Sequence, residues 1–153
     1  MDPELAGLYA LHVLFAGLWT GGVVFVTWAI LPLARDGGLD AEPLETITGR
    51  VKRLSRVSAV LLALTGVRMA MVLEYTETSV LLATTRGYLL VGMVALWLVL
   101  MGLVEAGASK LADGTGRRKV REPTRNARPF FLAATVVATL LLVDAGLLAA
   151  GSV

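Results

Sequence analysis

Four long apolar stretches, separated by short polar segments, dominate the sequence. They predict transmembrane helices over about 5–33, 54–74, 86–106 and 129–150, because a helix rising about 1.5 Å per residue needs about 20 residues to cross a membrane core. No stretch shows the alternation of apolar and polar residues that barrel strands require. The pattern therefore predicts an all-α membrane protein, a single four-transmembrane-helix bundle with up-down-up-down topology over residues 1–153.

The residues that flank these stretches refine the predicted helices. Pro32 and the pair Gly37-Gly38 mark the end of the first span, whereas Asn126 as a cap and Pro129 in the first turn predict the start of the last one. The second span follows an amphipathic segment that begins at Pro43. Its apolar positions recur at helical spacing with charged residues between them, at Leu44, Ile47, Val51 and Leu54. We expect this segment to extend the second helix past the lipid headgroups.

The basic residues predict the orientation of the chain. Of 14 Lys and Arg, five lie in 35–56 and seven in 110–128, while the two ends and the turn at 74–85 hold none. Basic loops stay in the cytoplasm, so both termini are predicted on the extracytoplasmic side of a prokaryotic cell (inner or plasma) membrane. The basic cluster at 117–121 then determines topology and contacts anionic lipid, and we expect no binding of nucleic acid.

The composition supports a membrane protein and excludes every type of site that needs a cysteine. Apolar residues make up 56% of the chain and the mean hydropathy is +0.74, whereas soluble proteins average about 45–50% apolar. The chain has no cysteine, which excludes disulfides, thiolate metal sites and thiol catalysis. The acidic start and the long apolar run that follows differ from a secretory signal, so the first span is expected to be retained.

Ionisable side chains interrupt three of the spans. His12, Arg68 and Asp144 lie six or seven residues from the outer ends of their spans, which at about 1.5 Å per residue places all three roughly 9–10 Å below the outer surface. Arg86 and Tyr88 begin the third span on the same side. Charges within spans are costly and usually functional or paired. We therefore predict a shared polar site in the outer half, or else a structural Arg68–Asp144 pair or an Arg68 that snorkels outward to the headgroups, beside a hydrogen-bonded His12.

The helix face that carries His12 is rich in aromatic and small residues. Phe15, Trp19 and Gly22 follow the histidine at steps of three and four residues, so they share its side of the helix. This face predicts either ordinary small-residue helix packing or a cleft that admits a flat cofactor.

Methionines supply possible soft ligands in the same half of the bundle. Met69 and Met71 follow Arg68, and Met93 lies about one turn below Tyr88. Thioether and imidazole groups together suit Cu(I), although methionine is also a common filler of apolar segments.

The first span resembles the first helix of the CopD copper-resistance membrane domain. The stretch from Leu11 to Phe25, followed by Leu31-Pro32, has a Leu-His, a Trp seven residues after the His, a Gly-Gly pair and a later proline. This resemblance implies handling or transport of copper at the membrane, with His12 and Trp19 as the residues that carry over, and an extracytoplasmic copper-binding partner. The motif covers about a fifth of the chain. It departs from the family at Arg86-Gly87-Tyr88, where many CopD-like proteins carry a lysine.

A second resemblance is to the four-span HemJ-type protoporphyrinogen oxidases, which also begin with a His, then a Trp and small residues. It implies that His12 is an axial ligand of haem b and that Arg68 or Arg86 pairs with a propionate. One histidine per chain allows five-coordinate haem, or bis-His ligation across a symmetric dimer.

Three functions therefore remain open from the sequence. The first is a CopD-like copper protein in which His12 is the ligand and Arg68 and Asp144 tune the site. The second is a haem-binding membrane redox protein, and the third is a non-catalytic accessory subunit whose buried polar groups set packing. We predict no catalytic residue. We expect a homo-oligomer, because a bundle of 153 residues leaves little room for a private cavity.

Overall fold

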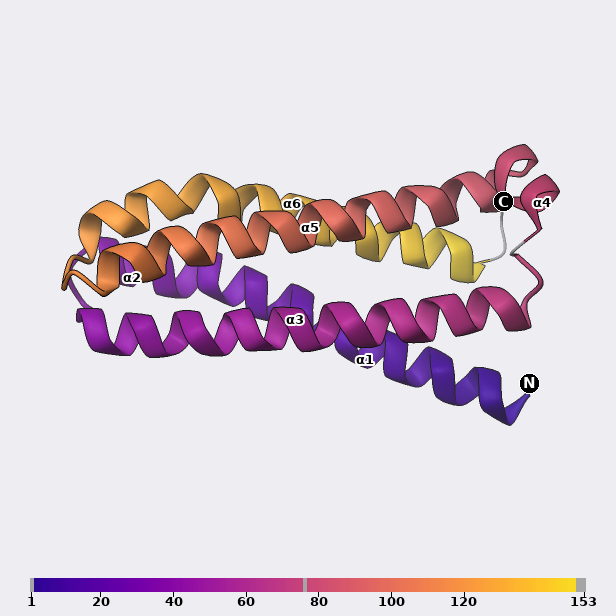
Figure 1. The fold of residues 1–153 in the computed structure, drawn as a ribbon, viewed down its shortest axis with the longest axis horizontal. Helices are drawn as coiled ribbons and strands as arrows, with labels where there is room; N and C mark the ends of the chain where they lie inside the picture. The colour runs from indigo at the N-terminus through magenta and orange to yellow at the C-terminus, as the bar shows by residue number, and fades with distance from the viewer. Residues whose placement is uncertain (1, 76, 151–153) are drawn as a thin grey trace.

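The computed structural model describes residues 2–75 and 77–150, and these residues are almost entirely helical. The helical segments in this part of the chain are α1 (Pro3–Phe25), η1 (Val26–Ile30), α2 (Leu31–Arg35), α3 (Ala41–Val72), α4 (Thr78–Ala83), α5 (Thr85–Thr115) and α6 (Arg121–Ala150). The first three form one continuous rod, so four long rods lie side by side and run up-down-up-down (Figure 1). The predicted all-α four-helix bundle is confirmed, and the described residues contain no strand.

The four rods are long and apolar enough to cross a membrane. They contain 33, 32, 31 and 30 residues, and at about 1.5 Å per residue each exceeds the roughly 30 Å of a hydrocarbon core. Large apolar side chains point outward, including Val13 at 65% exposure, Leu64 at 63% and Trp28 at 68%. Soluble monomers rarely expose such continuous apolar surface. The chain is therefore a multi-pass membrane protein whose outer surface suits a lipid bilayer.

The bundle has two chemically different ends. At the terminal end, α1 begins, α6 finishes, and α4 with its neighbouring turns joins α3 to α5. At the basic end, short connections join α2 to α3 and α5 to α6. α1 packs mainly against α3, and α5 packs along α6 and α3. Figure 1 shows the start of α1 displaced from the end of α6, with α3 beside α1.

The first rod changes its hydrogen bonding just before its proline. Pro32 has no backbone N–H, so the preceding turn cannot keep the α-helical pattern. The residues of η1 form a π-turn instead, in which Leu31 N–H donates to Val26 O. Thr27 Oγ1 lies 2.7 Å from Val23 O and 3.2 Å from Phe131 O. The rod therefore passes Pro32 and ends at Arg35, followed by Gly37 with a φ of 88°.

The amphipathic extension of the second span is confirmed. α3 is one helix from Ala41, two residues before Pro43, through to Val72. Leu44 and Thr48 are buried on one side of its first turns, whereas Arg50 and Arg53 are exposed on the other. The apolar spacing thus correctly placed a helix well outside the apolar stretch.

The predicted cap and first turn of the last helix are wrong. α6 begins at Arg121, and Pro129 lies inside it rather than in its first turn. Close packing explains why the helix continues through the proline: a Cβ at Gly114 would collide with the Pro123 ring, and one at Gly107 would lie 2.9 Å from Phe131 Cε2. Burial of this face of α6 against α5 offsets the hydrogen bond that Pro129 removes. The third helix likewise extends to Thr115, beyond the predicted 106.

Two buried clusters form the core. The cluster nearer the terminal end includes Trp19, Ala59, Leu100 and Ala134, which come from all four rods. The cluster nearer the basic end joins η1 and α2 to α3, α5 and α6 through residues that include Leu31, Leu44, Leu111 and Phe131. Polar residues that interrupt these clusters are therefore held at defined heights in the bundle.

Candidate functional site

His12 is fixed by a hydrogen bond to the neighbouring helix. Its Nδ1 lies 2.7 Å from Oγ1 of Thr65, which joins the terminal half of α1 to α3. The same Oγ1 lies 2.7 Å from Leu61 O and 3.3 Å from Leu62 O, both of which can only accept. Since a hydroxyl has one proton, Thr65 donates it to a carbonyl and accepts from Nδ1–H of His12. This arrangement leaves the Nε2 lone pair of His12 available to a ligand.

Glycines allow the close approach of α1 and α3 around this contact. A Cβ at Gly66 would lie 3.4 Å from Cε1 of His12, so the imidazole ring rests beside the backbone of α3. Nearly three turns further along α1, a Cβ at Gly22 would lie 3.1 Å from Leu54 Cδ2. The Gly22 side of α1 therefore packs against α3. This agrees with the first of the two sequence interpretations, small-residue helix packing rather than a cofactor cleft.

Arg68 forms an ion pair with Glu4, not with Asp144. Its Nη2 and Nε lie 2.6 Å and 2.7 Å from Glu4 Oε1, and the two side chains are 53% and 48% exposed. Of the structural roles that the sequence allowed for Arg68, pairing with Asp144 is therefore wrong in this structure. The long side chain of Arg68 extends toward the membrane surface, where the first turn of α1 supplies a carboxylate.

Asp144 is buried in α6. Its side chain is 8% exposed, and Oδ2 has no hydrogen-bond partner among the described residues. Trp19 is buried as well, at 2% exposure, and its indole N–H also lacks a partner in this part of the chain. Both residues therefore face the interior of the bundle.

Arg86 and Tyr88 support the start of α5. Nη1 of Arg86 lies 3.4 Å from Oη of Tyr75, and Oη of Tyr88 donates to Leu82 O at 2.8 Å. Tyr88 is 61% exposed. These contacts hold α5 to the connection from α3, and none of them joins either residue to His12.

The three candidate methionines face different surroundings. Met71 is 54% exposed and lines a shallow apolar hollow of about 230 Å³ with Ala63, Leu64, Val67 and Arg68. Met69 and Met93 are half-buried. Met69 follows Thr65 by four residues, so it lies one turn away on the face of α3 that holds His12. Met69 is thus the methionine best placed to share a ligand with His12.

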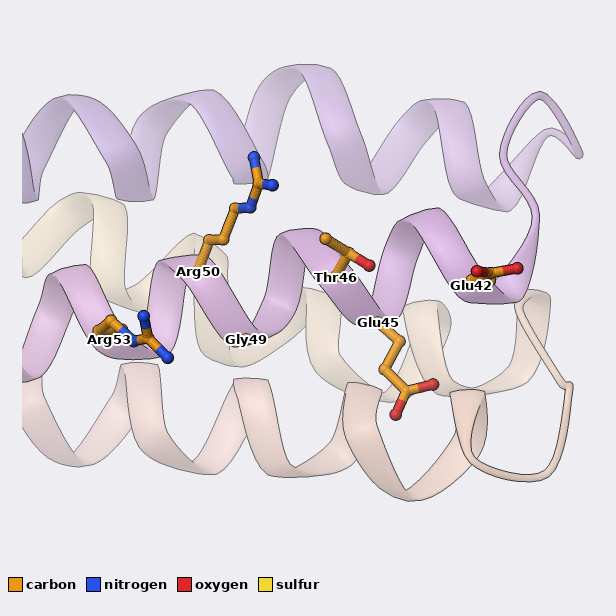
Figure 2. A pocket seen from close by; sticks show the side chains of 6 residues that line it. All are labelled: Glu42, Glu45, Thr46, Gly49, Arg50 and Arg53. Carbon is orange, nitrogen blue, oxygen red and sulfur yellow. The ribbon is translucent and has the colours of Figure 1, made fainter.

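A larger hollow lies elsewhere, on the outward face of α3 near the basic end. It measures about 470 Å³ and is lined by Glu42, Glu45, Thr46, Gly49, Arg50 and Arg53. Figure 2 shows Glu45 and Arg50 extending to opposite sides of α3. The hollow contains none of the predicted ligands and is an open, charged surface.

Sequence reasoning missed the partners of the predicted residues. Thr65 and Glu4 complete the contacts of His12 and Arg68. Glu105, which was not among the residues singled out from the sequence, accepts from Arg56 at 2.6 Å and 3.1 Å and lies 3.3 Å from Lys52 Nζ. Thr65 could have been found as a hydroxyl late in an apolar span. Glu105 could have been found as a lone carboxylate opposite a basic stretch.

The donor set limits the metal sites that this chain can form alone. Among the described residues, no group of three or more His, Cys, Asp or Glu side chains could hold a metal ion. A site at His12 would have to use thioether ligands, a second chain or a cofactor that brings its own donors.

Comparisons with known proteins leave the family open. No family model, curated protein or solved structure matches this chain. The assignment of function therefore rests on the residues themselves.

Proposed function

We propose that this chain is a CopD-like membrane protein that handles Cu(I), with Nε2 of His12 as the protein ligand. The observation that carries the proposal is the hydrogen bond between His12 Nδ1 and Thr65 Oγ1. Histidines that bind metals commonly donate the other ring N–H to an acceptor, which fixes the tautomer and the ring orientation. Thr65 supplies that acceptor here.

The choice of copper follows from the ligands near His12. An imidazole and a thioether are soft enough for Cu(I), which accepts few ligands. Met69 is the candidate second ligand because it lies one turn from Thr65 on the same face of α3. Met71 faces an apolar hollow beside Arg68 and is not assigned to the metal.

A second chain would complete such a site. One imidazole and one thioether give an incomplete coordination shell, so a homo-oligomer or an extracytoplasmic copper-binding protein would supply or receive the ion. The half-buried position of His12 near the terminal end suits transfer to a partner at the membrane surface. By the positive-inside rule this end is extracytoplasmic.

Copper binding can be tested by anaerobic titration of the purified protein with Cu(I) against a chromophoric chelator. We expect stoichiometric binding that H12A weakens by more than the roughly 10- to 100-fold that loss of an outer-shell partner costs, because H12A removes the ligand itself. M69L should weaken it, while M71L is the matched control and should bind like the wild type. Equal affinity of H12A and wild-type protein would overturn the proposal.

Haem b is the second candidate, and one specific observation favours it. A porphyrin supplies four nitrogen donors, so a single histidine suffices as an axial ligand, and His12 is the only histidine in the chain. The purified protein would then show a Soret band that H12A abolishes. If neither copper nor haem binds in a manner that depends on His12, the accessory-subunit hypothesis is favoured.

A further inference from the structure

Five buried polar atoms lie along the interior of the bundle without a hydrogen-bond partner among the described residues. They are Trp19 Nε1, Ser55 Oγ, Ser58 Oγ, Trp97 Nε1 and Asp144 Oδ2. Such groups are rare in folded proteins, and each costs free energy in an apolar surrounding. We call these five residues the interior polar track. Because each unpaired buried group costs free energy, five such groups in one bundle indicate a function.

Contacts between α1 and α3 set the heights of three of these residues. His12 meets Thr65, and Gly22 meets Leu54, so the two helices run antiparallel in a fixed register. This register places Trp19 level with Ser58. Ser55 lies one turn closer to the basic end on the same buried face, and both serines are almost fully buried.

Contacts of α5 set the heights of the other two. Gly107 meets Phe131 and Gly114 meets Pro123, a register that places Asp144 level with about Val94. Trp97 is one turn further inward and packs on the same core cluster as Trp19. At the far end, Lys52 and Arg56 both reach Glu105, so Ser55 lies at the height of Glu105.

The track thus runs from Asp144 past Trp97, then past Trp19 and Ser58, to Ser55 and Glu105. From Val94 to Glu105 the distance along α5 is about 16 Å at roughly 1.5 Å per residue. The successive heights are therefore about 5 Å apart. An offset of about 5 Å along the axis leaves room for one bridging water, which makes two hydrogen bonds of about 2.8 Å, between groups that face each other at successive heights.

We propose that the interior polar track is a proton path between Glu105 at the basic end and Asp144 in the terminal half. Carboxyl and hydroxyl groups both donate and accept, so Asp144, Ser58 and Ser55 can pass protons to and from bridging waters. Indole N–H groups only donate, so Trp19 and Trp97 hold waters without passing a proton.

Each transfer is balanced within the track. The Asp144 carboxylate forms its O–H bond as the neighbouring water loses a proton, and that water regains one from the next group toward Glu105, which is itself reprotonated from solvent at the basic end. Asp144, 8% exposed, then releases its proton toward the terminal end, and the cycle repeats. No electron is exchanged. Glu105 is half-exposed beside Lys52 and Arg56, which connects the path to solvent at the basic end.

A purely structural role would leave these groups paired with one another. The chain shows what a structural polar contact looks like: Thr135 Oγ1 lies 3.0 Å from Thr27 Oγ1 and 2.9 Å from Phe131 O, and every hydroxyl there has a partner. The track residues have none among the described residues, although each is buried or half-buried. A bridging water would give each of these groups the partner that a buried polar group needs.

Four other ionisable groups of the terminal half contact partners outside the track. Glu4 and Arg68 pair at the surface, His12 donates to Thr65, and Arg86 donates to Tyr75. The proton path is therefore independent of any metal at His12, and loss of copper binding leaves it untouched.

Proton uptake into liposomes that contain the purified protein and an internal pH dye tests the proposal. A potassium gradient with valinomycin supplies the driving potential. We expect D144N to slow uptake by roughly a hundredfold, the scale for removing a positioned proton-transfer group. S109A changes an exposed serine of α5 and is the matched control for S58A. S58A should slow uptake, and S109A should match the wild type.

A double variant guards against loss of folding in D144N. S55A/S58A removes two oxygen atoms and no charge, and the helix content of the purified protein should not change. If wild-type uptake equals that of protein-free liposomes, or if D144N and S55A/S58A both conduct like the wild type, the proton path is ruled out. Slower wild-type uptake in heavy water, with no such change in an empty-liposome control, would support it.

Discussion

His12 and Thr65 form the contact that joins α1 to α3 in the terminal half, with 2.7 Å between Nδ1 and Oγ1. The hydroxyl proton is directed to the backbone of α3, so the imidazole must donate from Nδ1 and leave Nε2 unprotonated. The tautomer is therefore the strongest link between fold and proposed function.

Replacing Thr65 by valine tests whether the His12 tautomer matters for copper binding, because it leaves His12 itself unchanged. We expect T65V to keep the fold, lose about 1 kcal/mol from the missing hydrogen bond, and bind Cu(I) about 10- to 100-fold more weakly because the imidazole tautomer is no longer fixed. Chelator competition measures the affinity, and thermal melting measures the stability. T139V, at an exposed threonine of α6, is the control. An unchanged T65V affinity would contradict the role of Thr65.

The Glu4–Arg68 ion pair makes a distinct energetic prediction. A double-mutant cycle with E4Q and R68Q should give a coupling free energy of about 0.2–1 kcal/mol, the range for exposed pairs, and added salt should reduce it. The corresponding cycle with D144N and R68Q should give no coupling. Unfolding in detergent measures both cycles. Coupling between Arg68 and Asp144 instead would restore the pairing expected from the sequence.

The fold could be predicted from the sequence because a membrane excludes most other structures for an apolar segment. A spanning segment must satisfy its own backbone, so four apolar stretches predict four helices. The amphipathic spacing before the second span predicted the start of α3 to within two residues. The start of α6 was missed because Pro129 suits a first turn by local preference, while packing of Pro123 and Phe131 against glycines of α5 decides the outcome.

The site was harder to predict because side-chain partners depend on register. Heights along each span were estimated well enough to group His12, Arg68 and Asp144, but height does not say which way a side chain points. Asp144 faces the interior and Arg68 reaches the surface, so they do not pair. A register between helices is set by contacts such as Gly22–Leu54, which a single sequence does not identify.

Orientation in the membrane can be tested directly, since the native chain has no cysteine to interfere. E77C lies in the turn before α4, and R117C lies in the connection between α5 and α6; both positions are exposed. We expect an impermeant thiol reagent added to intact cells to label E77C only, and R117C to need permeabilised cells, because the basic loops stay inside. Labelling of R117C in intact cells would reverse the orientation.

The contact between α5 and α6 predicts a large difference between two glycines of the same helix. A Cβ at Gly107 would lie 2.9 Å from Phe131 Cε2 and 3.2 Å from Phe130 Cβ, whereas one at Gly102 would meet nothing within 4 Å. G107A should therefore destabilise the protein by about 1–3 kcal/mol, as overpacking does. G102A should be neutral or slightly stabilising, because alanine favours a helix.

Thermal unfolding in detergent, followed by circular dichroism, compares the two variants under the same conditions. The comparison removes helix propensity as an explanation, since both variants replace a helical glycine of α5 by alanine. Phe131 belongs to the cluster that joins α6 to the first rod near η1. Loosening at Gly107 should therefore also weaken the Thr27–Phe131 contact, and equal melting temperatures for G107A and G102A would contradict this packing.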